Sequence, residues 1–527
     1  MDFATYYDAR RVPLLARNVV STSQPLASQA GLRMLLQGGN AVDAAIAAAI
    51  SLTVVEPTGN GIGSDGFAIL WDGDRLHGLN SSGRSPAGWT PERFAGMASM
   101  PDLGWESVTV PGAVAAWAAL SERFGRLPFA DLFAPALSYA REGFALTPTI
   151  AALWTKGAAR LKDQPGFAEH FLGGGRAPAA GETVRNPELA VTLEAIAVSR
   201  GRALYEGELA RKIVADGQRF GAALSEADLA AHAPEWCGTI SAPFFGTELH
   251  EIPPNGQGIV ATMAVAMLEH TDIADHAPDS IAAMHLQIEA IKLAMADAER
   301  FVSDPATMSV KPEALLDASY LAERARLIDR ARAGDPGAGA PKAGGTVYLT
   351  AADSSGMMIS LIQSNYSGFG SGVVVPGTGI HLQNRGSGFT LEQGHPNEVG
   401  PSKRPFHTII PGFLMRDGQP EMSFGVMGGP MQAQGHVQMV VRTVLHGQTP
   451  QAACDAPRWR VTEGRGLAVE WSMPAEIVDG LAALGHEITR EPPDNAFGFG
   501  GAQLVMRHRD GYVAGSDHRK DGMAVGF

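Results

Sequence analysis

The feature that most constrains this chain is a flexible segment that runs directly into a strand-like one. Residues 331–345 (ARAGDPGAGAPKAGG) consist mainly of alanine, glycine and proline, which favour loops and contribute little to a core. Thr346 then opens the run 346–350 (TVYLT), whose β-branched and aromatic residues favour a strand. A chain cut here would begin with a threonine. That residue supplies a hydroxyl nucleophile and, in its free α-amine, a general base with a pKa of about 7.7 to 8. Whether the chain is cut depends on the rest of the sequence.

The composition indicates a soluble globular protein. Apolar residues make up 45% and charged residues 18% of the 527 residues. No apolar run approaches the ~18 residues that a membrane-spanning helix needs. The N-terminus (MDFATYY) lacks the basic start and apolar core of a secretory signal, so we expect a cytoplasmic protein with no membrane partner.

Charge and cysteine content exclude two further classes. A formal net charge of −14 would repel a phosphate backbone, so we expect no nucleic-acid partner. Cys237 and Cys454 lie far apart, without histidines at ligand spacing. They predict two packed thiols rather than a disulfide framework or a zinc site.

The apolar periodicity changes at Thr346. Before it, a spacing of three to four residues predicts mainly helices: 25–55 with a break at 38–40, 113–123, 129–142, 187–198, 281–300 and 312–332. After it, the runs 347–352 and 357–363 flank the turn 353–356 (DSSG), which predicts a hairpin. Further strands are expected at 372–376, 409–415, 500–507 and 511–514, with helices at 432–446 and 474–484. This pattern predicts a layered α+β protein in which helices cover both faces of stacked sheets.

Common catalytic and nucleotide-binding signatures are missing from the sequence. There is no Gly-x-Ser-x-Gly elbow, no His-Glu-x-x-His, no phosphate-binding loop and no Cys-x-x-Cys. The glycines of residues 61–66 have the spacing of a dinucleotide-binding loop, but they lie between a helix and a strand, which is the reverse of the required order. Gly428 and Gly429 precede a predicted helix, so their backbone N–H groups suit either an oxyanion site or an ordinary tight turn.

Several longer motifs follow one another along the chain. They are residues 24–31 (QPLASQAG), 38–45 (GGNAVDAA), 55–57 (VEP), 61–67 (GIGSDGF), 110–112 (VPG), 403–405 (KRP) and 428–429 (GG). Together they resemble the γ-glutamyltransferase (glutathione hydrolase) family of N-terminal nucleophile hydrolases along nearly the whole chain. The resemblance implies a four-layer αββα sandwich with an extra helical region in the large subunit.

The resemblance also implies how the chain matures. A member of this family is made as one inactive precursor that cuts itself before a threonine, and the matching bond joins Gly345 to Thr346. Residues 1–345 would form a large (α) subunit, with a helical middle region and the flexible linker 331–345. Residues 346–527 would form a small (β) subunit. The two would stay together as one intertwined catalytic domain, without a cofactor or a metal, and dimerisation of this unit is left open.

The family pattern implies roles for four residues. The Thr346 hydroxyl would attack a substrate amide, with its own amine moving the proton, while Gly428 and Gly429 stabilise the oxyanion. Ser364 matches the position whose hydroxyl supports the threonine amine, although a strand serine with only a local hydrogen bond is the alternative.

The expected substrate pocket departs from the family. Members that act on γ-glutamyl groups hold the substrate's ammonium with an aspartate and an asparagine, whereas this chain has Gly388 and Tyr366 there. Losing one partner of a buried charge pair costs about 2 to 5 kcal/mol, which disfavours a γ-glutamyl substrate. A paired-serine site is replaced by His407-Thr408, and the usual arginine position holds Ser82, with Arg84 two residues later.

The pocket therefore keeps cations and lacks an anion. Arg84, Arg385 (within NRGSGF, which includes Ser387) and His407 are the candidate cations, and arginine suits a carboxylate. Solvated or structural ion pairs remain the alternative for the two arginines. The pattern resembles the branch that contains oxamate amidohydrolases and cephalosporin (glutaryl) acylases. The short segment between Phe389 and Lys403 implies an open pocket without a lid.

Three functions are consistent with these features. The first is an autoprocessed threonine amidohydrolase that acts on a small acidic amide, such as oxamate or a glutaryl amide. The second is a glutathione hydrolase or γ-glutamyltransferase with a rebuilt amino-acid site. The third is an uncut, catalytically silent binding protein. The natural substrate, and the balance between hydrolysis and transfer, are not specified by these residues.

Overall fold

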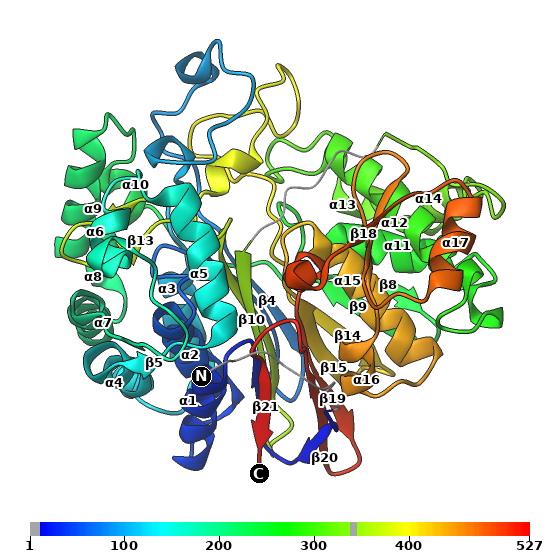
Figure 1. Cartoon of the computed structure of the whole chain (residues 1–527), viewed down its shortest axis with the longest axis horizontal. Coiled ribbons are helices and arrows are strands. Elements are labelled where there is room, and N and C mark those ends of the chain that lie inside the picture. The colour runs from blue at the N-terminus through cyan, green and yellow to red at the C-terminus, as the bar shows by residue number, and fades with distance from the viewer. Residues whose placement is uncertain (1–10, 338–344) are drawn as a thin grey trace.

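Two seven-stranded antiparallel sheets form the centre of the computed structural model, which describes residues 11–337 and 345–527 (Figure 1). We name them after one strand each. The β10 sheet has the order β21(Met523–Gly526), β2(Val19–Thr22), β10(Gly345–Ala352), β11(Met358–Tyr366), β3(Asp65–Trp71), β4(Leu76–Ser81), β7(Glu235–Trp236). The β15 sheet has the order β1(Leu14–Ala16), β20(Gly511–Ser516), β19(Ala502–His508), β15(Gln419–Val426), β14(Gly412–Arg416), β9(Thr247–Glu251), β8(Ile240–Phe244).

An apolar layer joins the two sheets. Phe67 of β3 and Tyr348 of β10 pack in one buried cluster with Phe413 of β14 and Val505 of β19. The residues of β10 are buried along its whole length. A strand covered on both faces has no solvent-exposed face, which explains why its sequence does not alternate apolar and polar residues.

Helices cover the outer face of each sheet. On the β10 sheet lie α1(Pro25–Leu36), α2(Ala41–Val55) and α3(Ala113–Phe124). The extra helical region lies further out on the same side, with α4(Ala134–Glu142) packed on α2 and α7(Pro187–Ser199) packed on α4; it also includes α5(Pro148–Leu161) and α9(Glu208–Arg219). The β15 sheet is covered by α11(Gly258–Glu269), α15(Met431–Val440) and α16(Pro450–Asp455), and α12(Ile281–Phe301) packs on α11. The fold is therefore α+β, with the four layers αββα that the sequence predicted.

Most of the expected elements are present with small shifts. The break between α1 and α2 comes at Gly38, whose φ of 88° is accessible to glycine, and Asn40 caps α2. The expected helix over residues 312–332 is wrong in its extent. The structure has α13(Pro312–Leu315) and α14(Ala318–Ala325), because the Asp317 side chain accepts hydrogen bonds from the first backbone N–H groups of α14 and starts a new helix. The expected strand 372–376 shrinks to β12(Val374–Val375).

The segments before and after Gly345 interleave in both sheets. In the β10 sheet, β10 and β11 lie between β2 and β3. In the β15 sheet, β1 pairs with β20 and β9 pairs with β14. Neither segment forms a complete sheet alone.

The described residues also show the state of the two cysteines and the length of the apolar helices. Both cysteines are free thiols, as expected, with Cys454 buried and Cys237 partly buried. Across residues 11–337 and 345–527, no helix combines the length and apolarity needed to cross a membrane.

Candidate active site

Thr346 is the second residue of β10 and is fully buried. The pairing of β10 with β11 shifts register here, because Gly345 lies opposite Tyr366 whereas Val347 lies opposite Gln363. Such a bulge changes the direction of nearby side chains. It brings the Ser364 hydroxyl to 3.2 Å from the Thr346 hydroxyl oxygen.

Ser364 is the hub of the local hydrogen bonds. Its Oγ donates to the carbonyl oxygen of Gly345 at 2.7 Å. The same oxygen accepts from the Arg385 Nη2 at 2.7 Å and from the Tyr366 backbone N–H at 2.8 Å. The carbonyl of the bond expected to be cut and the Thr346 hydroxyl expected to attack it are therefore both in contact with Ser364.

Gly428 and Gly429 form the turn between β15 and α15. Their φ values are 115° and 63°, a region that favours glycine. Among the described residues, no acceptor is paired with the backbone N–H of either glycine. An oxyanion site needs such available donors.

Two glutamines that no sequence motif indicates lie between this turn, Thr346 and Thr408. Gln432 of α15 donates from Nε2 to the Thr346 Oγ1 at 3.3 Å. Gln257 donates from Nε2 to the carbonyl oxygens of Gly429 and Thr408, at 2.9 and 2.5 Å. Neither glutamine lies in a recognisable motif, so only the folded structure reveals them.

A cavity of about 800 Å³ lies next to this cluster. Tyr366, Ser387, Gly388 and Thr408, which the sequence predicted to bind substrate, all line it. Pro430 and Gln257 line it too, as do Pro336 and Gly337 from the segment that leads to the expected cleavage site. Its volume falls in the usual range for a small-molecule site.

Arg385 lies behind the cavity wall. It is only 1% exposed and donates from Nη1 to the Thr408 Oγ1 at 2.7 Å. Its guanidinium carbon lies 4.7 Å from the centre of the Tyr366 ring. Burial lowers the pKa of Arg385 to about 10, which leaves it charged at neutral pH. Arg385 does not line the cavity itself, but it is hydrogen-bonded to Thr408, which does.

His407 is not a cation in this structure, which corrects our expectation. It is fully buried, accepts from the Ile409 backbone N–H at Nδ1 and contacts the Asp65 carboxylate through Nε2 at 3.0 Å. Burial, with added repulsion from Arg385 and Arg404, places its pKa well below the usual value. A neutral His407 with both ring nitrogens engaged is a poor ligand for a substrate anion.

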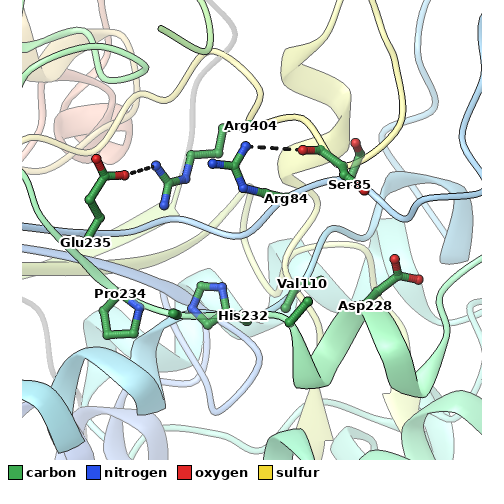
Figure 2. Close-up of a pocket in the computed structure, with 11 residues that line it drawn as sticks. Arg84, Ser85, Val110, Asp228, His232, Pro234, Glu235 and Arg404 are labelled. Atoms are coloured by element: carbon green, nitrogen blue, oxygen red, sulfur yellow. Dashed lines mark hydrogen bonds and ion pairs between the residues drawn. The ribbon is translucent and has the colours of Figure 1, made fainter. Parts of the chain in front are cut away.

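Arg84 also needs correction as a substrate-binding candidate. It lines a separate pocket of about 360 Å³, shown in Figure 2, together with Arg404 and His232. Its Nη1 donates to the Asp304 carboxylate at 2.9 Å, and its side chain is 45% exposed. Arg404 in the same pocket is paired with Glu235. Arg84 thus forms the structural ion pair that the sequence left open as the alternative.

Gly388 is fixed by close packing. A Cβ atom at this position would lie 2.7 Å from the carbonyl oxygen of Phe406, too close for any ordinary contact. The backbone here therefore admits no aspartate unless it shifts.

One buried group outside the cavity has the composition of a metal site. His285, Glu289 and His486 place their ligand atoms within 4.8 Å of one another. However, the Lys292 ammonium donates to Glu289 at 2.9 Å, and the two imidazoles are hydrogen-bonded to each other at 2.8 Å. A cation is already bound by the carboxylate, so this set does not suit a metal ion.

Comparisons with known proteins give consistent results. The family model described as gamma-glutamyltranspeptidase matches residues 27–527. The chain is 35% identical to the glutathione hydrolase-like YwrD proenzyme of Bacillus subtilis, over 97% of this chain and 98% of that one. It is 34% identical to the oxamate amidohydrolase proenzyme of Klebsiella pneumoniae, over 95% and 97%. The crystal structure of cephalosporin acylase from Bacillus halodurans superposes with a TM-score of 0.95 at 45% identity, covering 100% and 99% of the two chains.

Proposed function

Because this chain belongs to the gamma-glutamyltranspeptidase family, we propose that it cuts itself before Thr346 and then acts as an N-terminal threonine amidohydrolase. Its relatives over nearly the whole chain are hydrolases and acylases, and the chain is an enzyme of that class. Two of these relatives are named as proenzymes, which supports processing of one precursor into two subunits.

One observation carries the proposal: the Ser364 hydroxyl contacts the carbonyl oxygen of Gly345 and the hydroxyl of Thr346 together. Attack by the Thr346 Oγ1 on the Gly345 carbonyl carbon places negative charge on the carbonyl oxygen. The C–N bond then breaks, the amine nitrogen takes the hydroxyl proton, and an ester joins the two segments. Water hydrolyses this ester and leaves Thr346 with a free amine, as the first residue of the small subunit.

In the mature enzyme the same hydroxyl would attack a substrate amide. The α-amine of Thr346, with a pKa of about 7.7 to 8 when unperturbed, would accept the hydroxyl proton and pass it to the leaving amine. The N–H groups of Gly428 and Gly429, which have no acceptor among the described residues, are the donors we assign to the oxyanion. Water then releases the acyl group from Thr346.

We further propose that the acyl group ends in a carboxylate. Arg385 donates to the Thr408 Oγ1, so the hydroxyl proton of Thr408 is available to a group in the cavity. The positive charge of Arg385 lies directly behind it. Gly388 offers no carboxylate to a substrate ammonium, a loss that costs about 2 to 5 kcal/mol in a buried pair. Two similar proteins are named for oxamate and for cephalosporin, both of which carry a carboxylate.

Two variants test the nucleophile. Thr346→Ala removes the hydroxyl, so the chain should remain one band near 55.3 kDa on a denaturing gel. Thr346→Ser keeps a hydroxyl and is the matched control, which should still be cut. N-terminal sequencing of the small fragment should begin at residue 346. A wild-type chain that stays intact, or a cut elsewhere, would refute the proposal.

The substrate class needs a separate measurement. A similar protein is named glutathione hydrolase-like, so glutathione is the competing substrate. Release of ammonia or amine should be followed in parallel for oxamate, a glutaryl amide and glutathione. We expect the two acids without an ammonium to be preferred, and faster turnover of glutathione would favour the alternative.

A further inference from the structure

Arg385 is buried, and no carboxylate among the described residues is hydrogen-bonded to it. In residues 11–337 and 345–527, no Asp or Glu forms an ion pair with its guanidinium, although the buried Asp65 carboxylate is near enough to interact with it electrostatically, and its Nε has no hydrogen-bond partner. Its hydrogen bonds run to two hydroxyls, those of Ser364 and Thr408. Burying a charge is costly, and this guanidinium directs its hydrogen bonds to two hydroxyls rather than to that carboxylate. Its charge acts at short range on the groups it does contact.

The bonds around Ser364 determine where its proton points. A serine hydroxyl has one proton to donate and two lone pairs that accept. Arg385 and the Tyr366 backbone N–H occupy the two lone pairs, at 2.7 and 2.8 Å. The proton is therefore directed to the Gly345 carbonyl oxygen at 2.7 Å, a shorter contact than the 3.2 Å to the Thr346 hydroxyl. Donation from a charged group also makes this hydroxyl a stronger donor.

We propose that Arg385 is a positioning residue for self-cleavage, which orients and polarises Ser364 so that this hydroxyl stabilises the oxyanion formed on Gly345. This inference rests on the proposed cleavage between Gly345 and Thr346. The precursor then has an oxyanion donor of its own, distinct from the Gly428–Gly429 turn that we assign to substrates. Ser364 touches the reacting carbonyl, whereas Arg385 acts only through Ser364.

The geometry favours this positioning role for Arg385 over direct binding of a substrate. The Tyr366 ring stacks on the guanidinium at 4.7 Å, and Tyr366 rather than Arg385 lines the cavity. Tyr366 itself has a φ of 75°, an uncommon conformation for a tyrosine, and is paired with Gly345 across the strands. Tyr366 thus contacts the Arg385 guanidinium and is also the strand partner of Gly345, whose carbonyl belongs to the bond expected to be cut.

Arg385→Met tests the inference, because methionine is unbranched and apolar and removes both the charge and the hydrogen bonds. Purified full-length chain is followed over time on denaturing gels for conversion of the intact band. We expect conversion at least about tenfold slower than in the wild type, since loss of one oxyanion donor costs about a hundred- to a thousandfold and Ser364 itself remains. Arg123→Met is the matched control, because Arg123 also stacks on an aromatic ring, Trp236 at 4.5 Å, far from this site. It should convert at the wild-type rate.

Rescue separates positioning from folding. Arg385→Lys keeps the charge and should convert at an intermediate rate. Arg385→Ala leaves a space in which added methylguanidinium should accelerate conversion. If Arg385→Met converts as fast as the wild type, or if neither lysine nor methylguanidinium restores any conversion, the inference is overturned. Failure of the proposed function is distinct, because the wild-type chain itself would then remain uncut.

Discussion

In the proposed function, Gly388 is the residue that most directly limits which substrate the cavity accepts. It lies in the cavity wall, where an acidic side chain would be needed to hold a substrate ammonium. The close approach of the Phe406 carbonyl oxygen leaves no room for a side chain at this position. The packing of the cavity wall therefore also explains why no carboxylate is present here.

Restoring the acid at this residue should therefore fail. In Gly388→Asp the new Cβ would lie 2.7 Å from the Phe406 oxygen, so the backbone must shift. Overpacking of this kind costs about 1 to 3 kcal/mol of unfolding free energy. Gly388→Ala adds the same Cβ without the charge and should lose a similar amount in urea unfolding. We expect no gain in glutathione hydrolysis from Gly388→Asp, and a gain at unchanged stability would contradict this account of the wall.

Single residues were predictable where they belong to a motif. The sequence pointed to Thr346, Ser364 and Tyr366, and the strand register of the fold brings them together. It gave no signal for Gln432, whose contact with Thr346 depends on where α15 begins. It also suggested a charge on His407, because the burial and the neighbouring arginines that lower its pKa arise only in the folded chain.

At the scale of elements, one face of α12 anchors the chain ahead of the proposed cut. His285, Glu289 and Lys292 lie on this face, because they are separated by about one helical turn each. The Lys292 ammonium donates to the Gly334 carbonyl at 3.0 Å, and the Gly334 N–H donates to Glu289 at 2.9 Å. His285 contacts the carbonyl of Asp329 at 2.8 Å. The network fastens residues 329–334 to the body of the protein.

This network predicts how far a protease can shorten the large fragment. In the cut protein, limited proteolysis followed by mass spectrometry should leave residues up to Gly334 intact. Lys292→Met removes the ammonium from the network, so cleavage should extend to residues before Gly334. Lys212→Met is the control, since Lys212 forms an exposed pair with Glu208 on α9. Equal trimming of both variants would argue against the anchor.

Periodicity identified elements better than it identified their ends or their neighbours. The long helix α12 and the hairpin of β10 and β11 follow from local patterns, with bounds close to those expected. The boundary between α13 and α14 depends on a single capping residue, Asp317, within a pattern that stays periodic across it. Strand neighbours such as β1 and β20 lie at opposite ends of the chain, so no local pattern indicates their pairing.

For the whole molecule, buried histidines should make the fold sensitive to acid. Burial lowers the pKa of His232 and His486 to about 3 and that of His381 to about 4. The unfolded chain takes up these protons at about pH 6.5, whereas the folded chain does not. Stability should therefore be full above about pH 6.5 and fall as the pH drops towards these lower values. His407 and His436 each contact a buried carboxyl whose own pKa is raised. The raised carboxyl pKa stabilises the fold as the pH falls, so within each of these two pairs it opposes the destabilising effect of the histidine.

Urea unfolding at a series of pH values tests this sensitivity. Each of the three histidines should lower the unfolding free energy by up to about 1.4 kcal/mol per pH unit below about 6.5. His381→Gln should make the loss less steep, because glutamine does not titrate. His508→Gln is the control, since His508 is exposed and its removal should leave the slope unchanged. A stability that does not depend on pH in this range would refute the prediction.

The layered fold followed from the sequence at the level of class. Hairpins after Thr346 and helices before it indicated stacked sheets with helices on both outer faces, and the family motifs specified four layers. The order of strands did not follow, because each central sheet is assembled from segments hundreds of residues apart, such as β2 with β10.

The interleaving of strands across Gly345 also determines what becomes of the two fragments. After the cut, β10 and β11 of one fragment remain bonded between β2 and β3 of the other, and β1 and β9 remain bonded to β20 and β14. Separating the fragments would break both sheets and expose the layer between them. We therefore expect the large and small fragments of one precursor to stay associated and not to exchange with those of other molecules. Mixing two mature preparations, one of them isotope-labelled, should then produce no hybrid pairs of fragments, and a defect in one copy would stay confined to that copy.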